Sequence, residues 1–485
     1  MAQTDLLLLH PPDFIGRQPE AAVATIREER YIPLGPLYLA SHLRRHGLRA
    51  MVAPLRDFYQ ERGCYLDYDD GSQAAVDRFV WKSARILSSL VQRLQPRAVG
   101  ISLNYALHER AVELLLEVLR RDQPGLPVML GGVHATLTAA DWLRRPAGPD
   151  WVVLGEGEET CRRLLAADLQ ADGIPGLGWR TPAGHLELRP TPRLLGAREL
   201  SHPLDLDLLA LPRWSSFEEL LHYVHFSRGC SWRCAFCCSP HIWGRRRLRD
   251  PETVATEIAA LHRRGVRQVF VTDEALIPRS AGYEEILGVL GRFKDMRFCG
   301  LMRPDHLDRV DPEALRLANL ELVYLGVESF STRVLRAMNK GMTGRRFRTF
   351  SGALRRLRAA GVRTTLLIML GYPHGGPGED GRTVETCRRL AEEGLIWDLG
   401  VAHTAPFPGT ALAREEGTSF RLLEPRRHHW NLSEPVIELV GRGGRVTYPA
   451  AQMAAAYREL ESIRVRFGLG PYRAAGSRGL GLEGP

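Results

Sequence analysis

The sequence predicts an α/β protein with an N-terminal doubly wound sheet, a partial (β/α)6 barrel and a small, mainly helical C-terminal region. Two series of short apolar runs, each run followed by a helix-like segment, predict the sheet and the barrel. The chain has 485 residues, which at roughly 150 per domain suggests about three domains. We expect a sheet domain over 1–172, a hairpin and linker over 173–220, a barrel over 221–412, and a C-terminal region over 413–485.

The first series covers the first 170 residues and indicates an open parallel sheet. Strands are expected at 5–9, 49–52, 98–103, 127–130 and 151–154. Helices are expected at 36–46, 73–94 and 108–121, with a short one ending at 145. Glycine and proline then break residues 175–192 into two short runs, which predicts a hairpin, and 190–220 reads as a linker.

The second series begins near residue 222 and predicts the barrel. Its strands are expected at 223–226, 268–272, 297–301, 322–327, 363–370 and 399–404. Its helices are expected at 251–264, 283–293, 312–319, 332–338, 344–360 and 382–393. A helix over 449–467 and a Gly/Arg-rich tail follow. In such a barrel the chemistry lies at the carboxyl ends of the strands.

Charge and hydropathy narrow the range of partners. The net charge is +9, and only three of the 65 basic residues are lysine (Lys82, Lys294 and Lys340). The arginines are spread along the whole chain, whereas a nucleic-acid binder more often gathers its charge into a stripe, so no nucleic-acid partner is expected. Apolar runs stay far below the ~18–20 residues of a membrane span, and the first residues lack a basic leader. We therefore expect a cytoplasmic protein with reduced cysteines.

One cysteine cluster dominates the sequence. Cys230, Cys234 and Cys237 follow the first barrel strand with the spacing C-x3-C-x2-C. Thiolates at this spacing on a loop can converge on one small metal centre, and three ligands leave one iron of a [4Fe–4S] cluster open. The alternative is a zinc site with Cys238 or His241 as the fourth ligand. Cys238 directly follows Cys237, which makes joint ligation of one metal awkward, and a small buried residue is the simpler interpretation.

From Tyr223 to Leu412 the chain resembles the radical S-adenosylmethionine (radical SAM) superfamily. The resemblance implies that Cys230, Cys234 and Cys237 hold a [4Fe–4S] cluster whose open iron binds S-adenosylmethionine (SAM). Further positions at strand ends then imply SAM contacts: Phe236 and Gly371 near the adenine, Thr272, Asp273 and Glu274 at the amino group, Arg303 at the carboxylate, and Glu328 and Ser329 at the ribose. The glycines of the family's Gly-Gly-Glu segment are absent before Glu274. Asp273 could instead be an exposed helix cap, and Ser329 a helix N-cap.

The remaining cysteines indicate a single cluster. Cys299 and Cys387 are the only cysteines after Cys238, and Cys64 and Cys161 are the only ones before Cys230. Two cysteines cannot hold the auxiliary cluster of the peptide-modifying branch. The methylthiotransferase branch needs three in its N-terminal domain, so sulfur insertion is disfavoured.

A doubly wound, Rossmann-like domain before such a barrel resembles the cobalamin (B12)-binding branch, which includes the class B radical SAM methyltransferases. The resemblance implies cobalamin contacts at Leu37, Tyr38, Ser102, Leu103, Gly131, Gly132, Val133, His134, Gly155, Glu156 and Gly157. Small residues at strand ends let a large planar ligand approach the backbone. Residues 57–63 lack the histidine of the Asp-x-His-x-x-Gly motif, and Asn104 stands where the branch has leucine. His134 could meet the nucleotide tail or be an ordinary loop histidine, and the sheet could have lost cobalamin binding.

Together these resemblances imply a methyltransferase. A 5′-deoxyadenosyl radical would abstract hydrogen from an unactivated carbon, and methylcobalamin would deliver a methyl group to the resulting radical. Less often, the methyl acceptor would be a phosphorus centre. The alternative is a cobalamin-dependent cyclase or rearrangement enzyme, and a remote one is a non-catalytic cofactor-binding protein. The implied partners are a small-molecule substrate and a flavodoxin- or ferredoxin-type electron donor, and we expect a monomer. His428, His429, Trp430 and Asn431 either line a pocket or simply pack.

Overall fold

The structure is a computed structural model that describes residues 3–12, 32–59, 73–212, 222–342, 345–425 and 432–470. The described residues divide into two compact units, the first ending at residue 220 and the second beginning at 221. The predicted borders at 172 and 412 stay predictions.

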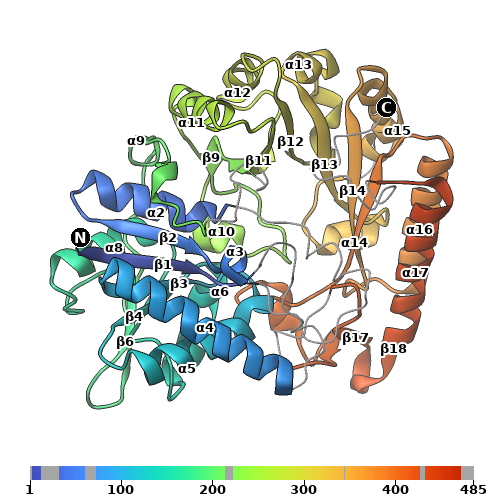
Figure 1. Ribbon diagram of the computed structural model, residues 1–485. Helices are drawn as coiled ribbons and strands as arrows, with labels where there is room; N and C mark the ends of the chain where they lie inside the picture. Colours follow the sequence, from blue (N-terminus) through green and yellow to red (C-terminus); the bar gives the residue numbers. More distant parts are fainter. Residues whose placement is uncertain are drawn as a thin grey trace. The chain divides into compact units, whose positions relative to one another are not determined.

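The first unit is built on a seven-stranded sheet in the order β2-β1-β3-β4-β5-β6-β7 (Figure 1). The strands are β1 (Thr4–His10), β2 (Ala50–Pro54), β3 (Pro96–Ser102), β4 (Val128–Gly131), β5 (Trp151–Val153), β6 (Leu177–Arg180) and β7 (Leu186–Leu188). The first five are parallel, and β6 and β7 form an antiparallel hairpin at the edge. The predicted doubly wound sheet is confirmed, and the predicted hairpin extends it.

Helices cover both faces of this sheet. They are α2 (Leu34–Arg45), α3 (Leu55–Tyr59), α4 (Gln73–Leu94), η1 (Ala106–His108), α5 (Glu109–Asp122), α6 (Val133–Leu137), α7 (Ala139–Arg144), α8 (Gly157–Ala166), α9 (Ala197–Leu200) and η2 (Leu206–Leu208). α4 packs against α5, and α2 packs against α8 (Figure 1). The strand order reverses between β1 and β3, and in doubly wound sheets the crevice outside the carboxyl ends at this point binds ligands.

The core of the first unit follows from burial on both faces. Leu6, Leu7, Leu8 and Leu9 of β1 are all buried, because a central parallel strand has helices above and below it. The long helix α4 buries one stripe only, at Ala75, Phe79, Ser83, Leu87 and Leu90. This spacing of three to four residues is that of an amphipathic helix.

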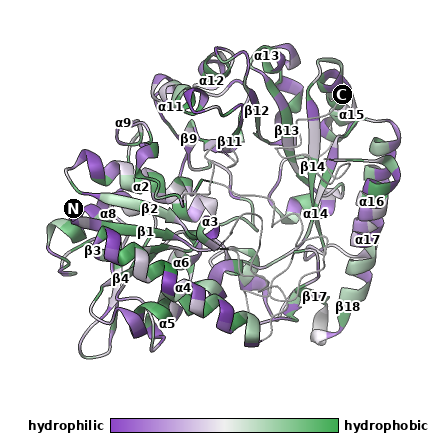
Figure 2. Cartoon of the chain, in the orientation of Figure 1, coloured by the Kyte–Doolittle hydropathy of each residue, from purple (hydrophilic) through white to green (hydrophobic). Residues whose placement is uncertain are grey.

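The second unit is built on six parallel strands in the order β15-β14-β13-β12-β11-β8. They are β8 (His222–Val224), β11 (Gln268–Leu276), β12 (Arg297–Met302), β13 (Leu320–Glu328), β14 (Arg363–Leu370) and β15 (Asp398–His403). Figure 2 shows β12 and β13 as largely hydrophobic. Each predicted barrel strand is present, and their carboxyl ends lie at one edge.

The helices of the second unit lie mostly along the outer side of the strands (Figure 1). They are α10 (Ser239–Trp243), α11 (Pro251–Arg263), α12 (Tyr283–Leu290), η4 (Pro304–Arg309), α13 (Pro312–Leu317), α14 (Thr332–Ala337), α15 (Arg345–Ala359), α16 (Pro377–Glu392) and α17 (Ala450–Phe467). A two-stranded ribbon of β9 (Ser227–Arg228) and β10 (Arg247–Leu248) stands beside the start of the sheet.

The C-terminal region holds more than the expected helix. Between η5 (Leu412–Glu415) and α17 lies an antiparallel sheet of β16 (Phe420–Leu422), β17 (Ile437–Val440) and β18 (Val446–Tyr448), with η7 (Arg442–Gly444) in its last turn. Strands of three or four residues are too short for an alternating pattern to stand out in the sequence. His428, His429, Trp430 and Asn431 lie outside the described residues.

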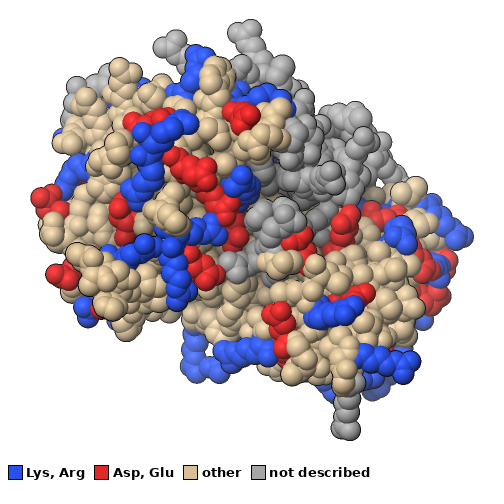
Figure 3. Space-filling view, turned by 90° about the horizontal axis from the view of Figure 1, so that it is seen from below, with Lys and Arg blue, Asp and Glu red and all other residues tan. Residues whose placement is uncertain are grey.

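Among the described helices, none combines the length and the apolar character needed to cross a membrane. On the face shown in Figure 3, basic and acidic side chains are interspersed.

Candidate functional site

The cysteine loop begins at a turn that only glycine fits. Gly229 has φ +94°, and a Cβ there would lie 2.6 Å from the carbonyl oxygen of Arg245 and 2.8 Å from that of Trp243. The amide of Cys230 donates to the carbonyl of Gly244 at 3.0 Å. The loop therefore leaves β9 in one defined direction.

Distant segments fasten the middle of the loop. The amide of Ala235 donates to the carbonyl of Met338 at 3.0 Å, and the Ala235 carbonyl accepts from the amide of Leu412 at 3.0 Å. Asn339 Nδ2 donates to the carbonyl of Arg233 at 2.8 Å. Segments more than a hundred residues further along the chain thus hold the backbone between Cys230 and Cys237.

The residues Cys230, Cys234 and Cys237 are half-buried. Burial raises the pKa of the Cys230 and Cys237 thiols, that of Cys237 to about 11, and the nearby Glu274 carboxylate adds to the rise. Within the described residues, no three His, Cys, Asp or Glu side chains are grouped to hold a single ion. A polynuclear cluster needs wider sulfur spacing than one tetrahedral ion. Three soft thiolate donors on a fastened loop fit a [4Fe–4S] cluster.

Thr272, Asp273 and Glu274 lie within β11, which runs further than expected. Asp273 is fully buried and accepts hydrogen bonds from the amide of Phe226, at 2.7 Å, and from Ser227 Oγ. It is therefore not an exposed helix cap but an anchor for the start of the cysteine loop. Glu274 points the other way, is exposed, and accepts from Ser239 Oγ at 2.9 Å just after the cysteines. Thr272 Oγ1 donates to the carbonyl of Val224 at 3.2 Å.

Arg303 lies at the end of β12, directly against the loop. Its Nε and Nη2 donate to the two carboxylate oxygens of Asp305, each at 2.9 Å, and Nη1 donates to Cys234 Sγ at 3.4 Å. Its guanidinium also covers the ring of Trp232 at 4.6 Å. The structure thus places Arg303 beside the predicted cluster.

Glu328 ends β13 in a left-handed conformation, with φ +66°. Its carboxylate accepts from Lys340 Nζ at 2.7 Å, and both side chains are largely buried. Lys340 Nζ also donates to the carbonyl of Gly326 and lies 5.8 Å from the centre of the Phe236 ring. One lysine therefore links the predicted ribose residue Glu328 to the predicted adenine residue Phe236.

Ser329 turns away from this group. It is buried, its Oγ lies 3.2 Å from Thr383 Oγ1, and it accepts from the amide of Ser331 at 3.1 Å. The residue at the N-cap position of α14 is Ser331, so the N-cap alternative for Ser329 is wrong. The role of Ser329 at the ribose stays a prediction.

Gly371 occupies a tight, left-handed turn after β14, with φ +68°. A Cβ there would lie 2.6 Å from Met453 Sδ of α17. Its amide donates to Asp380 Oδ2 at 2.8 Å, and the same oxygen accepts from the Tyr448 hydroxyl at 2.9 Å. Burial raises the pKa of Asp380 to about 6. A buried carboxyl group thus ties the predicted adenine turn to the C-terminal region.

In the first unit, the structure brings five of the predicted cobalamin residues together. Ser102, Leu103, Gly131, Gly132 and Val133 meet where β3 and β4 end. The amide of Leu103 donates to the carbonyl of Gly131 at 2.7 Å. A Cβ on Gly132, which has φ +108°, would lie 2.6 Å from the carbonyl oxygen of Leu103.

Asn104, which departs from the branch's leucine, stabilises this same turn. Its Oδ1 accepts from the amide of Val133 at 3.2 Å, and its Nδ2 donates to Ser102 Oγ at 3.2 Å. The departure therefore keeps the two strand ends joined.

Other predicted cobalamin residues have packing partners. His134 Nε2 lies 2.5 Å from Glu109 Oε1, with both side chains buried, so this nitrogen faces a carboxylate and not an open site. Leu37 and Tyr38 are buried in α2. The amide of Gly155 is held by Thr136 Oγ1 at 3.0 Å. Glu156 and Gly157 pack at the start of α8, where Glu156 accepts from the amide of Leu195 at 2.8 Å and a Cβ on Gly157 would lie 3.0 Å from Leu39.

Sequence reasoning missed several residues at the two strand ends. His10, Tyr105 and His108 form a chain of edge-on rings where β1 and β3 end, and Tyr105 is 60% exposed. In the second unit, Tyr372 packs edge-on to Phe236, and its buried hydroxyl has no partner among the described residues. Only the predicted strand order could have pointed to these positions, because single aromatic residues carry no spacing signal.

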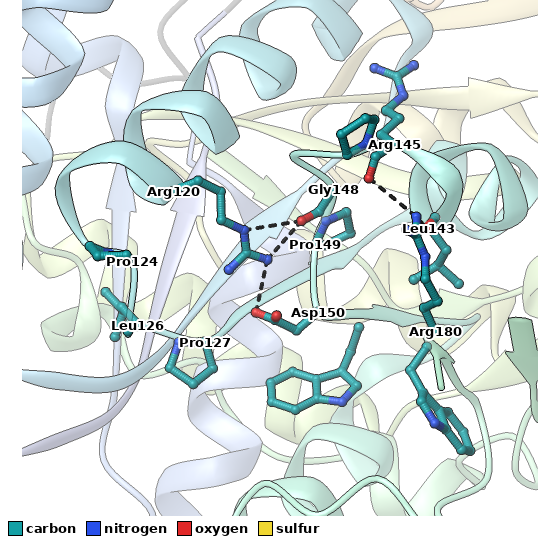
Figure 4. A pocket seen from close by; sticks show the side chains of 14 residues that line it. Arg120, Pro124, Leu126, Pro127, Leu143, Arg145, Gly148, Pro149, Asp150 and Arg180 are labelled. Carbon is teal, nitrogen blue, oxygen red and sulfur yellow. Dashed lines mark hydrogen bonds and ion pairs between the residues drawn. The ribbon is translucent and has the colours of Figure 1, made fainter. Parts of the chain in front are cut away.

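A hollow of about 560 Å³ lies at the opposite, amino-terminal edge of the first sheet (Figure 4). Its arginines are already engaged: Arg120 Nη2 donates to the carbonyl of Gly148 at 2.8 Å and pairs with Asp150, and Arg180 donates to the carbonyl of Leu143. These guanidinium groups tie loops together, and the hollow lies away from the carboxyl ends of the strands.

Comparison with known protein families gives one match for each of the two predicted domains. Residues 224–390 match the family described as the radical SAM superfamily, and residues 21–165 match the B12 binding domain. The chain thus combines a radical SAM domain with a B12 binding domain, as predicted, and these two domains match the expected cofactors, which are a [4Fe–4S] cluster, SAM and cobalamin.

Individual relatives carry methyltransferase and cyclase names. An uncharacterised methyltransferase of Pyrococcus horikoshii is 24% identical over 441 residues, covering 90% of this chain and 88% of that protein. An anaerobic magnesium-protoporphyrin IX monomethyl ester cyclase of Synechocystis is 30% identical over 271 residues, covering 52% and 53%. The fold is similar to that of the radical SAM methyltransferase TsrM of Kitasatospora setae, solved with tryptophan and a SAM analogue, with a TM-score of 0.68, 17% identity, and coverage of 95% and 89%.

Proposed function

We propose that this enzyme methylates an unactivated carbon, or a phosphorus centre, of a small-molecule substrate. The observation that carries the proposal is the fastened C-x3-C-x2-C loop at the carboxyl ends of six parallel strands, in one chain with a doubly wound sheet whose small residues meet at its own carboxyl edge. The relatives named as methyltransferases support the same reaction class.

Residues of the second unit would bind the cluster and SAM. When bound, the cluster and SAM supply a radical that abstracts hydrogen, and cobalamin supplies a transferable methyl group. Cys230, Cys234 and Cys237 would hold the cluster, and Glu274, which is exposed close to these cysteines, would meet a cationic amino group. Glu328, held by Lys340, would accept hydrogen bonds from ribose hydroxyls.

The residues of the first unit would seat the second cofactor. The Gly131–Gly132 turn, fixed by Asn104, keeps side chains clear of the carboxyl edge of the sheet. Tyr105, exposed at the point where strand order reverses, offers an aromatic face for a planar ligand. We propose a flavodoxin- or ferredoxin-type electron donor, a monomer and a cytoplasmic location.

Metal and cofactor content tests the proposal first. The protein is purified without oxygen, reconstituted with iron, sulfide and hydroxocobalamin, desalted, and analysed for iron, cobalt and the visible spectrum. About four irons and about one cobalt per chain are expected. Iron without cobalt would overturn the cobalamin-dependent reaction and leave a cobalamin-free radical SAM enzyme.

A second candidate function is cyclisation or rearrangement without methyl transfer, favoured by the cyclase relative of Synechocystis. The by-products separate the two reactions. In both reactions, reductive cleavage of SAM releases methionine and 5′-deoxyadenosine. Methyl transfer releases S-adenosylhomocysteine as well, from a second SAM, whereas a cyclase does not. Equal amounts of S-adenosylhomocysteine and 5′-deoxyadenosine during substrate turnover would support methylation, and the absence of S-adenosylhomocysteine would favour the cyclase.

A further inference from the structure

Arg303 contacts a predicted cluster ligand directly. Its Nη1 donates to Cys234 Sγ at 3.4 Å, within the range of a hydrogen bond to sulfur. The resemblance to radical SAM enzymes gives Arg303 a different task, at the carboxylate of SAM. The geometry around the guanidinium bears on which of the two tasks it performs.

Asp305 fixes the orientation of the guanidinium. Both oxygens of its carboxylate accept from Arg303, at Nε and Nη2, each at 2.9 Å, and both side chains are less than a tenth exposed. This two-pronged geometry points the remaining edge of the guanidinium, at Nη1, toward Cys234. Gly341 allows the arrangement, because a Cβ there would lie 2.8 Å from Asp305 Oδ2.

Trp232 holds the guanidinium from its flat side. The ring lies 4.6 Å from Arg303 Cζ, and Trp232 itself stands in the loop between Cys230 and Cys234. His306 packs edge-on to the same ring, with 5.5 Å between ring centres. A cation over an aromatic face is further stabilised by the charge distribution of the ring. The guanidinium is therefore fixed by three partners: the Asp305 carboxylate along one edge, the Trp232 ring on its flat side, and Cys234 Sγ at Nη1.

Three of the five N–H donors of Arg303 are thus already in use, on Asp305 and Cys234. To bind the SAM carboxylate, Arg303 would have only the second N–H of Nη1 and the second N–H of Nη2. A cation held against a cysteine ligand, in contrast, needs no rearrangement. Hydrogen bonds to cluster sulfurs, and positive charge near them, favour the more negative, reduced form of an iron–sulfur cluster.

We propose that Arg303 is a positioning residue for the cluster: its charge-assisted hydrogen bond to Cys234 raises the reduction potential of the [4Fe–4S] centre. The inference rests on the proposed function, since it requires that Cys234 holds the cluster. A more positive potential makes the one-electron reduction by the external donor more favourable. The same contact orients the Cys234 side chain before the cluster arrives.

The test compares Arg303→Met, Arg303→Lys and Arg297→Met in anaerobically reconstituted full-length protein without SAM. Arg297 begins the same strand, is exposed, and its change removes the same charge, so it is the matched control. A redox titration followed by electron paramagnetic resonance measures the potential, and iron analysis confirms four irons per chain. At the midpoint of the wild type, the reduced-to-oxidised ratio should fall about tenfold in Arg303→Met, which corresponds to a 59 mV shift for one electron.

The other variants and SAM binding complete the test. Arg297→Met should titrate like the wild type, and Arg303→Lys, which keeps the charge without the planar fork, should shift part of the way. An unchanged potential in Arg303→Met, together with a weaker affinity for SAM, would overturn the inference in favour of the carboxylate task. If Arg303→Met holds fewer than four irons, an unchanged potential in Arg303→Lys overturns it. A wild type with no cluster signal would refute the proposed function instead.

Discussion

Adjacent cysteines in the loop have different predicted roles. Cys237 is a predicted cluster ligand, whereas Cys238 occupies the N-cap position of α10, and its carbonyl accepts from the amide of His241 at 2.9 Å.

Replacing single cysteines should separate these roles. Cys230→Ala should lose the cluster, because two ligands do not hold it. Cys238→Ala should keep about four irons per chain. Iron analysis after anaerobic reconstitution makes the comparison. Equal iron loss in both variants would show that Cys238 is a ligand and would revive the four-donor alternative.

Asp380 is a second residue whose environment has a measurable effect. Its pKa is about 6 in the folded protein against 3.8 ordinarily, because burial disfavours the charged carboxylate. Between these values the folded protein binds a proton that the unfolded chain has released. The free energy of unfolding should therefore fall by up to about 3 kcal/mol as the pH rises from about 4 to above 6.

Asp380→Asn removes this titration while keeping an acceptor for the Gly371 amide. The free energy of unfolding of the wild type and of the variant is measured in urea at several pH values between 4.5 and 7. As the pH rises, the wild type should lose stability relative to the variant. A difference that stays constant across this range would contradict the assignment.

Among structural elements, turns and strand ends carry the sites. The turn between β4 and α6 depends on Gly132. Its φ of +108° is unfavourable for residues with a side chain, and a Cβ there would lie only 2.6 Å from the carbonyl oxygen of Leu103. Gly125, in the loop before β4, has an ordinary φ, and a methyl group added there would have no heavy atom within 4 Å, so it offers a matched control.

Gly132→Ala should lower the free energy of unfolding of the first unit by about 1–3 kcal/mol or more, because alanine is strained at this φ angle and its methyl group would clash with Leu103. The same change should weaken cobalt retention. Gly125→Ala should be nearly neutral on both measures. Urea unfolding and cobalt analysis after reconstitution test this. Normal cobalt retention by a folded Gly132→Ala protein would place the cofactor away from this turn.

The end of β13 and the turn after α14 are joined by the Glu328–Lys340 pair. Lys340→Met would leave the Glu328 carboxylate buried without its partner, which should cost about 3–5 kcal/mol. Lys294→Met changes an exposed lysine and should stay within about 0.5 kcal/mol. The double variant with Glu328→Gln should recover part of the loss. A Lys340→Met protein as stable as the control would mean that the pair contributes little.

Strands and motifs were predictable to different degrees. The barrel strand at 363–370 and the helix at 73–94 were predicted to the residue, because a continuous apolar run and a long amphipathic pattern leave little choice. The cysteine loop followed from its spacing. The partners Asp305 for Arg303, Lys340 for Glu328 and Glu109 for His134 did not, because an ion pair leaves no periodic trace in a chain with so many charged residues.

At the scale of the whole molecule, charge is abundant but mixed. The net charge of +9 is distributed among interspersed acidic and basic side chains on the face seen in Figure 3. Net positive charge of this size disfavours self-association at low salt. The protein should therefore sediment as a monomer of 54.3 kDa in analytical ultracentrifugation at low ionic strength. A concentration-dependent dimer would contradict this expectation.

The order of the strands has a consequence for how the chain matures. In the six-stranded sheet of the second unit, the spatial order of the strands is their order along the chain, so each strand can pair with the preceding strand of that sheet. The cysteine loop follows the first of these strands, yet its backbone is fastened by Met338 and Leu412. During synthesis the ligands thus emerge early, but their loop becomes rigid only once residue 412 has left the ribosome. Iron–sulfur assembly machinery should therefore load this protein at the end of translation, and nascent chains released before Leu412 should fail to retain iron.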